Sequence, residues 1–264
     1  MLAFRQALSI GNEQTPLVMV AGHGWQPGKP LLQHLARSYP VTLVSTSDLA
    51  GLQRRLAGIN TACHLIGHDL GTVPALQAAL SQPQKVCSLS LINPAAFGLL
   101  RQLQDWEGWD AAQRLAGNVI ALHSAGANVL AARTLVKFWF GNTTWWLLRP
   151  AQKRQILRQL PSIVDALAEI YSHEPHRHDL QSLRMPVHLL CSRRAPMPTR
   201  HLAEQLQPLI PVATLSLAAQ QGRQPGPAYI ASSLTGWLRQ LESDGGGSDE
   251  PHREAENAVW SDAT

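Results

Sequence analysis

One short segment, Gly67-His68-Asp69-Leu70-Gly71, has residue types and a spacing that could support chemistry. An apolar, strand-like run leads into it and a helical pattern follows, which is the arrangement of a nucleophile elbow. The two glycines tolerate the close backbone approach and the strained dihedral angles of such a turn. The reactive position of the turn holds Asp69, so a carboxylate stands where an attacking group would be placed.

Strand-like and helical patterns alternate along the chain, and these elements must position the turn. Continuous apolar runs bounded by turn signals predict strands of a parallel sheet that is covered on both faces. These runs are residues 16–22, 41–47, 62–68, 87–93, 186–192 and 212–219. The segments between most of them have helical spacing. The alternation predicts an α/β fold built on a doubly wound, mostly parallel sheet.

The alternation stops between the fourth and fifth predicted strands. Residues 98–180 have a helical pattern throughout, which predicts a helical cap over the sheet. The core domain is then formed by residues 1–97 and 181–242. Residues 243–264 are polar, rich in glycine and acidic, so we predict a disordered acidic tail there.

Composition excludes several classes of function. The net charge is +4, but the basic residues are scattered and form no cluster typical of nucleic-acid binding. No apolar stretch is long enough to predict a membrane span, and the first residues do not resemble a secretory signal. Three sparse cysteines in apolar runs indicate reduced thiols and a cytoplasmic protein. We expect no metal and no cofactor, and whether there is a protein partner stays open.

Two motifs together carry a family resemblance. The segment 21–25 (AGHGW) after the first predicted strand, and the segment 67–71 after the third, resemble the α/β-hydrolase superfamily. The resemblance covers about residues 4–241 and implies the α/β-hydrolase fold with a helical cap. In this family two backbone N–H groups form an oxyanion hole. The resemblance places them at Leu70 and Trp25.

The resemblance also implies a Ser-His-acid triad, and all three positions are changed in this chain. Asp69 stands at the serine position and Asn93 at a possible acid position. The histidine position, counted back from the closing helix, holds Gln221. An amide cannot accept and return a proton near neutral pH. We therefore predict that ordinary esterase activity is absent and that a pocket for a small, partly apolar molecule is retained.

An active enzyme is the alternative. Epoxide hydrolases and haloalkane dehalogenases of this superfamily attack through an aspartate at this position, so Asp69 could form a covalent ester. A histidine-activated water must then release that ester. A lyase or isomerase that uses Asp69 as a general base stays open, as does an interaction module that uses the cap or the tail.

Four further side chains are expected at the pocket: His23, His68, Trp145 and Trp146. The two histidines are also typical of packed, hydrogen-bonded scaffold residues. The two tryptophans either pack the cap on the sheet or line an apolar pocket over Asp69. We expect no proton shuttle to reach Asp69, and an imidazole within bonding distance of its carboxylate would reverse the prediction of inactivity.

Overall fold

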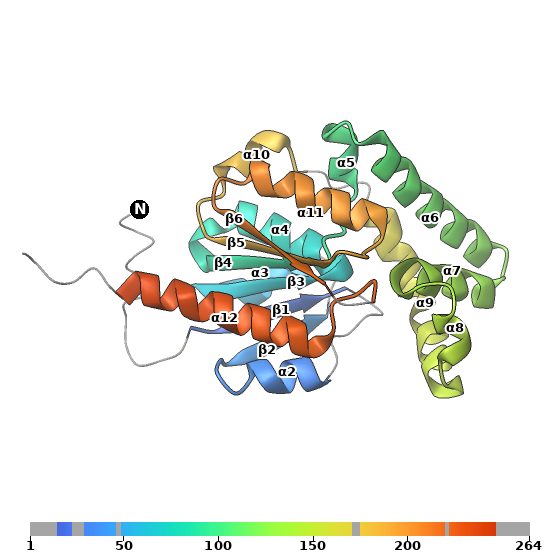
Figure 1. The fold of residues 1–264 in the computed structure, drawn as a ribbon, viewed down its shortest axis with the longest axis horizontal. Helices are drawn as coiled ribbons and strands as arrows, with labels where there is room; N and C mark the ends of the chain where they lie inside the picture. Colours follow the sequence, from blue (N-terminus) through green and yellow to red (C-terminus); the bar gives the residue numbers. More distant parts are fainter. Residues whose placement is uncertain (1–14, 23–28, 46–48, 171–174, 220–221, 247–264) are drawn as a thin grey trace, which may run out of the picture.

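Six strands form the centre of the molecule. The computed structural model describes residues 15–22, 29–45, 49–170, 175–219 and 222–246 (Figure 1). The strands are β1 (Leu17–Ala21), β2 (Val41–Ser45), β3 (Cys63–His68), β4 (Val86–Ile92), β5 (Val187–Ser192) and β6 (Ala213–Ala218). Each begins and ends within two residues of the predicted run.

All six strands are parallel and form one sheet in the order β2-β1-β3-β4-β5-β6. Every residue of β1, β4 and β5 is buried, which explains why these runs are continuously apolar rather than alternating. The predicted doubly wound, parallel α/β sheet is therefore confirmed. Because β3 lies inside the sheet, the turn that follows it is surrounded by the ends of neighbouring strands.

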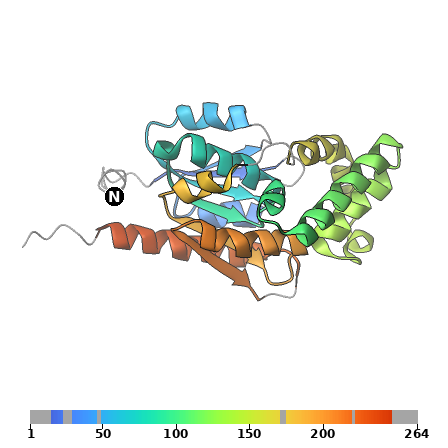
Figure 2. The same cartoon turned by 90° about the horizontal axis from the view of Figure 1, so that it is seen from above.

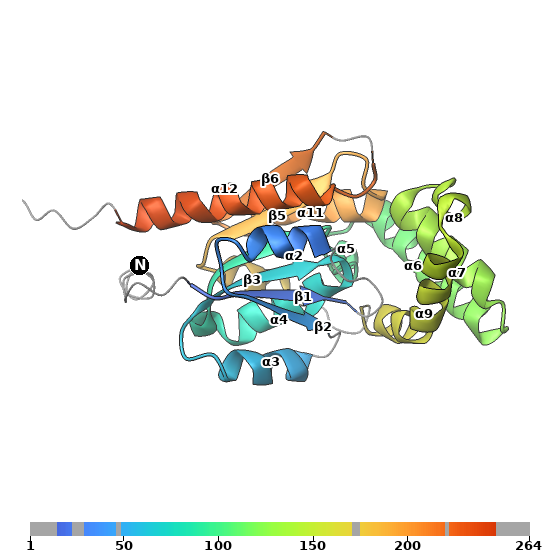
Figure 3. The same cartoon turned by 90° about the horizontal axis from the view of Figure 1, so that it is seen from below.

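Helices cover both faces of the sheet (Figures 1 and 3). On one face the core is completed by α3 (Leu49–Ala57), α4 (Thr72–Ser81) and α11 (Met197–Leu209). The other face is covered by α2 (Lys29–Leu35) and α12 (Pro227–Gly246). A short helix, α10 (Arg177–Ser182), precedes β5. The apolar faces of these helices bury the sheet on both sides.

Helices between β4 and α10 gather beyond one end of the sheet (Figure 2). They are α5 (Gly98–Gln102), α6 (Trp106–Ser124), α7 (Asn128–Phe140), α8 (Thr144–Leu147) and α9 (Pro150–Ile170). Among them, α6 packs on both α7 and α9, and α7 packs on α9. We call these five helices the cap, and the assignment of residues 98–180 to a separate cap domain stays a prediction.

One aspartate fixes the cap to the core. Asp105 caps the N-terminus of α6 by accepting a hydrogen bond from the Gly108 N–H at 2.9 Å. The same carboxylate lies 2.8 Å from His201 Nδ1 and 2.7 Å from Gln205 Nε2, both on α11. The start of α6 is thereby held against a helix of the core.

The last helix corrects the predicted tail. Helix α12 continues to Gly246, so residues 243–246 belong to a helix and not to the predicted disordered segment. The helix ends in a run of glycines, which have the lowest helix propensity after proline. The remaining predicted tail, residues 247–264, lies outside the described residues. No helix within the described ranges is long and apolar enough to cross a membrane.

Candidate functional site

The turn after β3 has the shape of an elbow. A short helical turn, η1 (Asp69–Gly71), joins β3 to α4, and Asp69 has a left-handed φ of 49°. Only glycine fits at two positions beside it. A Cβ on Gly71 would lie 2.3 Å from the Val20 carbonyl oxygen, and one on Gly67 would lie 2.6 Å from Thr72 Cα. The close contact of the turn with its neighbours therefore requires the two glycines that the sequence singled out.

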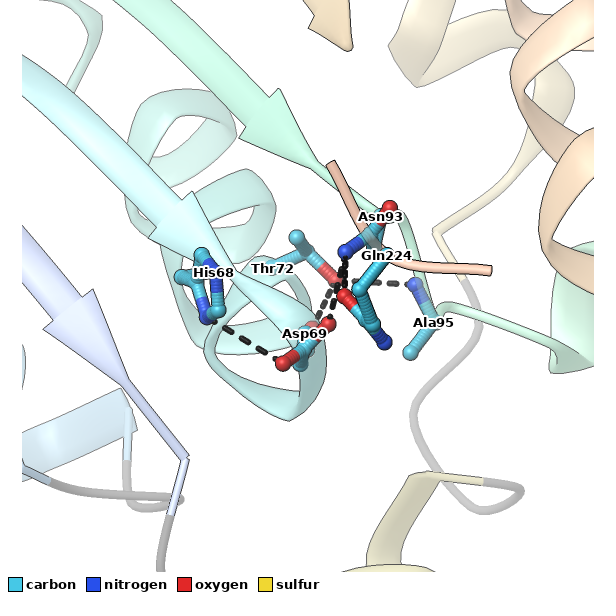
Figure 4. A network of polar contacts seen from close by, with 6 residues as sticks. All are labelled: His68, Asp69, Thr72, Asn93, Ala95 and Gln224. Atoms are coloured by element: carbon cyan, nitrogen blue, oxygen red, sulfur yellow. Dashed lines mark hydrogen bonds and ion pairs between the residues drawn. The ribbon is translucent and has the colours of Figure 1, made fainter. Parts of the chain in front are cut away.

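Thr72 stabilises the turn through two hydrogen bonds of its side chain. Its Oγ1 donates a hydrogen bond to the Asp69 carbonyl oxygen at 2.6 Å and accepts one from the Ala95 N–H at 2.9 Å (Figure 4). The turn after β3 is thus linked to the loop after β4. We did not identify Thr72 from the sequence, because a threonine at the start of a helix has no distinctive pattern.

Two amide side chains meet the Asp69 carboxylate on one side. Asn93 follows β4, and its Nδ2 donates a hydrogen bond to Asp69 Oδ1 at 3.1 Å. The same Nδ2 donates to Oε1 of Gln224, which follows β6 (Figure 4). Asp69 and Asn93 are each 1% exposed, and both have positive φ angles. Three loops at the carboxyl ends of β3, β4 and β6 therefore bring one carboxylate and two amides together.

An imidazole lies on the other side of the same carboxylate. His68 Nδ1 is 3.2 Å from Asp69 Oδ2 (Figure 4). Burial disfavours a charged imidazole, but the adjacent Asp69 carboxylate outweighs that effect and raises the pKa of His68. The expectation that no imidazole comes within reach of Asp69 is wrong, so the prediction of inactivity can no longer rest on it. Successive side chains alternate along a strand, but the left-handed φ of Asp69 breaks the alternation and lets the two neighbours meet.

A cavity of about 500 Å³ opens above this group. His68, Asp69 and Gln224 form part of its floor. Helices α7, α8 and α9 of the cap contribute much of its remaining wall, which includes three glutamines, Gln152, Gln155 and Gln159. Apart from His68 and Asp69, the lining side chains are uncharged. Within the described ranges, no group of three His, Cys, Asp or Glu side chains is placed to hold a metal ion.

The structure corrects the prediction that Trp145 and Trp146 line the pocket. Trp145 is buried among Ala132, Val136 and Ile156 of the cap helices. Trp146 points away from them and is 63% exposed. Neither residue belongs to the wall of the cavity. Adjacent residues of a helix point in directions about 100° apart, so one tryptophan packs the cap while the next faces solvent.

The other predicted site residues divide into two groups. Leu70 directly follows Asp69 and is buried, and the role of its backbone N–H in an oxyanion hole stays a prediction. His23, Trp25 and Gln221 lie outside the described residues. The amide beside Asn93 belongs to Gln224, which the sequence does not reveal because a loop has no periodicity from which to count.

A parallel sheet, an elbow after an inner strand and a helical cap define the α/β-hydrolase fold. A scan against models of known protein families found no match, and a search of curated proteins also found none. The solved structures include many similar folds. One is an α/β hydrolase from Sphaerobacter thermophilus, with a TM-score of 0.67 and 17% sequence identity over 86% of this chain and 93% of that chain.

Two further structures show the same likeness. MenH from S. aureus has a TM-score of 0.63 and 16% identity, covering 88% of this chain and 96% of that chain. The carboxylesterase CesB from Bacillus subtilis has a TM-score of 0.59 and 15% identity, covering 90% and 96%. At such identities the likeness establishes the fold. The predicted resemblance is confirmed at that level: this protein has the α/β-hydrolase fold.

Proposed function

We propose that this protein binds a small, partly apolar and uncharged molecule in the cavity above Asp69, without ordinary ester hydrolysis. The contacts of the Asp69 carboxylate are the main support for this proposal. Asn93 holds one of its oxygens and His68 approaches the other. The Asp69 carboxylate raises the pKa of His68 and so favours the charged ring relative to a free histidine, and a charged ring cannot take a proton from water.

Gln224, which lies beyond Asn93 from Asp69, supports the same conclusion. Ester hydrolysis by a triad needs a base that removes the nucleophile's proton and later returns it. The loop after β6 presents the amide of Gln224 to Asn93, and an amide has no suitable pKa. The site therefore consists of one carboxylate that contacts the Asn93 amide and the His68 ring, and of a second amide, Gln224, that contacts Asn93.

The lining of the cavity supports the class of ligand. Apolar side chains such as Val136, Ile156 and Ile230 would contact an apolar body. The glutamines of α9 can each donate and accept hydrogen bonds at the polar end of a ligand. His68 and Asp69 lie against one another, and the rest of the described lining has no charged side chain that would attract an ion.

A binding experiment tests the first half of this proposal. Nile red is neutral, partly apolar and fluorescent in apolar surroundings, and we expect it to bind in the cavity. Replacing Gln159→Trp fills part of the cavity and should weaken binding at least tenfold, by our estimate of about 1.4 kcal/mol or more. The matched control is Arg158→Trp, a neighbouring residue outside the lining. Equal binding by the wild type and both variants would contradict the proposal.

An activity experiment tests the second half. We expect the wild-type protein to hydrolyse p-nitrophenyl butyrate no faster than Asp69→Ala does. The triple variant Asp69→Ser, Asn93→Glu, Gln224→His should gain turnover, because it restores a nucleophile, an acid and a base around the elbow. The matched control replaces Gln221→His instead of Gln224→His. Wild-type turnover that disappears in Asp69→Ala would refute the proposal.

The approach of His68 favours one second candidate, a hydrolase in which Asp69 is the nucleophile. Above its raised pKa, His68 is neutral and could activate the water that releases a covalent ester. Turnover would then increase as pH rises through that pKa. In the variant His68→Gln, incubation with styrene oxide or 1-bromobutane would leave an adduct on Asp69 that is visible by mass spectrometry. If neither compound gave an adduct or a product, this candidate would be eliminated.

A further inference from the structure

One side of the cap exposes an unusual number of large apolar side chains. They are Val129, Leu130 and Phe140 of α7, and Trp146 and Leu147 of α8. Trp146 is 63% exposed and Leu147 is 80% exposed. Among the described residues, only two other large apolar side chains are comparably exposed, Trp106 and Val212. We call the five residues, together with Arg133 and Lys137, the α7–α8 face.

The residues from α7 lie on one side of that helix. Val129, Arg133, Lys137 and Phe140 follow one another at intervals of four, four and three residues, which places them along one stripe. Arg133 and Lys137 are both exposed. The Arg133 guanidinium lies over the Trp146 ring at 4.8 Å, so the stripe continues directly onto α8. Apolar and cationic side chains therefore alternate over one continuous surface.

Most of the cap around this face lacks negatively charged side chains. No aspartate or glutamate occurs from residue 111 to residue 164, although this stretch spans most of α6, all of α7 and α8, and most of α9. Seven basic residues occur in it: Arg114, Arg133, Lys137, Arg149, Lys153, Arg154 and Arg158. Their combined charge exceeds the net charge of +4 of the whole chain. A partner of complementary charge must be anionic.

We propose that the α7–α8 face docks on an anionic lipid surface. Protruding tryptophan and leucine side chains enter the boundary between headgroups and acyl chains, while neighbouring cations bind anionic headgroups. The α7–α8 face has both components, and its apolar side chains protrude rather than line a groove that would receive a protein segment. Phe140 belongs both to this face and to the wall of the cavity, so docking places the cavity beside the lipid.

Flotation of the full chain with lipid vesicles tests this proposal. Vesicles of phosphatidylcholine alone are compared with vesicles in which about one third of the lipid is phosphatidylglycerol. We expect binding to the anionic vesicles only, and less binding as salt is added. The double variant Arg133→Gln, Lys137→Gln should lower the partition coefficient roughly thirtyfold, since each cation near such a surface contributes about a factor of five.

A matched pair of tryptophan variants locates the surface. Trp146→Ser should weaken vesicle binding, whereas Trp106→Ser replaces an equally exposed tryptophan outside the face and should leave binding unchanged. Leu147→Asp should weaken it further, because it places a negative charge against anionic headgroups. All five substituted positions are exposed, and circular dichroism checks that each variant is folded. The absence of vesicle binding by folded wild-type protein would overturn the proposal.

Two other results would also overturn it. Equal losses in Trp146→Ser and Trp106→Ser would show that the α7–α8 face does not mediate the contact. A wild-type dimer in sedimentation that Leu147→Asp dissociates, with no vesicle binding, would assign the face to a second copy of this chain.

Discussion

Two histidines of the same strand have opposite surroundings. His68 ends β3 and lies beside Asp69 at the cavity. His64, near the start of β3, has its Nδ1 2.8 Å from Ser88 Oγ and its Nε2 3.9 Å from Glu242 Oε1. A serine, a histidine and a carboxylate thus lie close together at the end of the strand away from the elbow. Their residue types are those of a catalytic triad.

The two regions differ in whether a small molecule can reach them. Ser88 is 2% exposed and His64 is 1% exposed, and neither lines the cavity above Asp69. The elbow has a cavity but lacks the residue types of a triad, while the His64 region has the types but is packed beneath α12. A substrate reaches only the first region. The comparison teaches that a cavity, rather than a set of residue types, marks the candidate site.

The pKa values of the buried histidines also differ in direction. Burial lowers the pKa of His64 to about 4, and it has the same effect on His188 in β5. His188 bonds Ser216 through Nε2 at 2.9 Å and stacks on Trp237 of α12. The Glu242 carboxylate, 3.9 Å from His64 Nε2, does not offset burial there, whereas Asp69 does so for His68. Burial therefore disfavours the charged ring under α12, whereas the Asp69 carboxylate favours it at the elbow.

The largest expected effect is the loss of stability in acid. His64 and His188 have folded pKa values near 4 and unfolded values near 6.5. Their contribution to stability is complete above pH 6.5 and disappears as pH falls toward 4. Each shift corresponds to about 3 kcal/mol of unfolding free energy. Urea unfolding at a series of pH values measures this change.

Two variants isolate that change from other titrating groups. His64→Asn keeps an acceptor near Ser88, and His188→Gln keeps a polar group near Ser216, but neither side chain titrates. We expect the unfolding free energy of each variant to decrease less than that of the wild type between pH 7 and pH 4. An identical pH dependence in all three proteins would remove the contrast between the two regions.

The next effect concerns the backbone of the elbow. A Cβ at position 71 would lie 2.3 Å from the Val20 carbonyl oxygen, so Gly71→Ala should reduce the unfolding free energy by about 3 kcal/mol. The matched control is Gly117→Ala in α6, where no atom lies within 4 Å of the added Cβ. That change should stabilise the protein by up to about 1 kcal/mol, because alanine favours helices. Equal effects of the two substitutions would show that the turn is not closely packed.

The fold could be predicted from the sequence because its signals are local. The strands of the parallel sheet are buried on both faces, so β4 and β5 appear as continuous apolar runs. The elbow could be found because Gly67 and Gly71 occupy positions that no other residue fits. The extension of α12 into the predicted tail was missed, since polar residues at a helix end resemble those of a disordered segment.

The site was less predictable because its contacts join distant segments. Asn93 was found because the family resemblance places a possible acid position directly after the strand that follows the elbow helix, and the structure brings this residue to Asp69. Gln224 was missed, because its position depends on the path of a loop. The approach of His68 to Asp69 depends on one positive φ angle, and sequence patterning does not reveal such an angle. Side-chain geometry at a turn therefore required the structure.

A smaller effect is expected when a second carboxylate is placed at the site. In Asn93→Asp a negative charge replaces the amide that donates to Asp69 Oδ1 at 3.1 Å. Two adjacent carboxylates cannot both ionise readily, so the pKa of the pair rises. We expect a loss of about 1–3 kcal/mol in unfolding free energy at pH 7, relative to the wild type. The loss should shrink as pH falls through the raised pKa, because one proton then neutralises the pair.

Asn93→Ala is the control for this substitution. It removes the same hydrogen bond without adding a charge, so its cost in unfolding free energy should vary little between pH 7 and pH 5. If Asn93→Asp had the same small pH dependence, the carboxylate of Asp69 would not face position 93 as closely as the structure indicates.

The smallest effect on stability, and the most direct test of the contrast, is the titration of His68. Asp69 outweighs burial and raises the pKa of His68 above 6.5. In Asp69→Asn only burial remains, so the pKa should fall below 6.5, as it does for His64. In the wild type, the stabilisation from this pair is complete below pH 6.5 and is lost as pH rises through the raised pKa. NMR titration of the His68 ring in both proteins measures the shift. An unchanged pKa would mean that Asp69 does not affect the titration of His68. The interaction of these two side chains would then no longer support the proposed binding function.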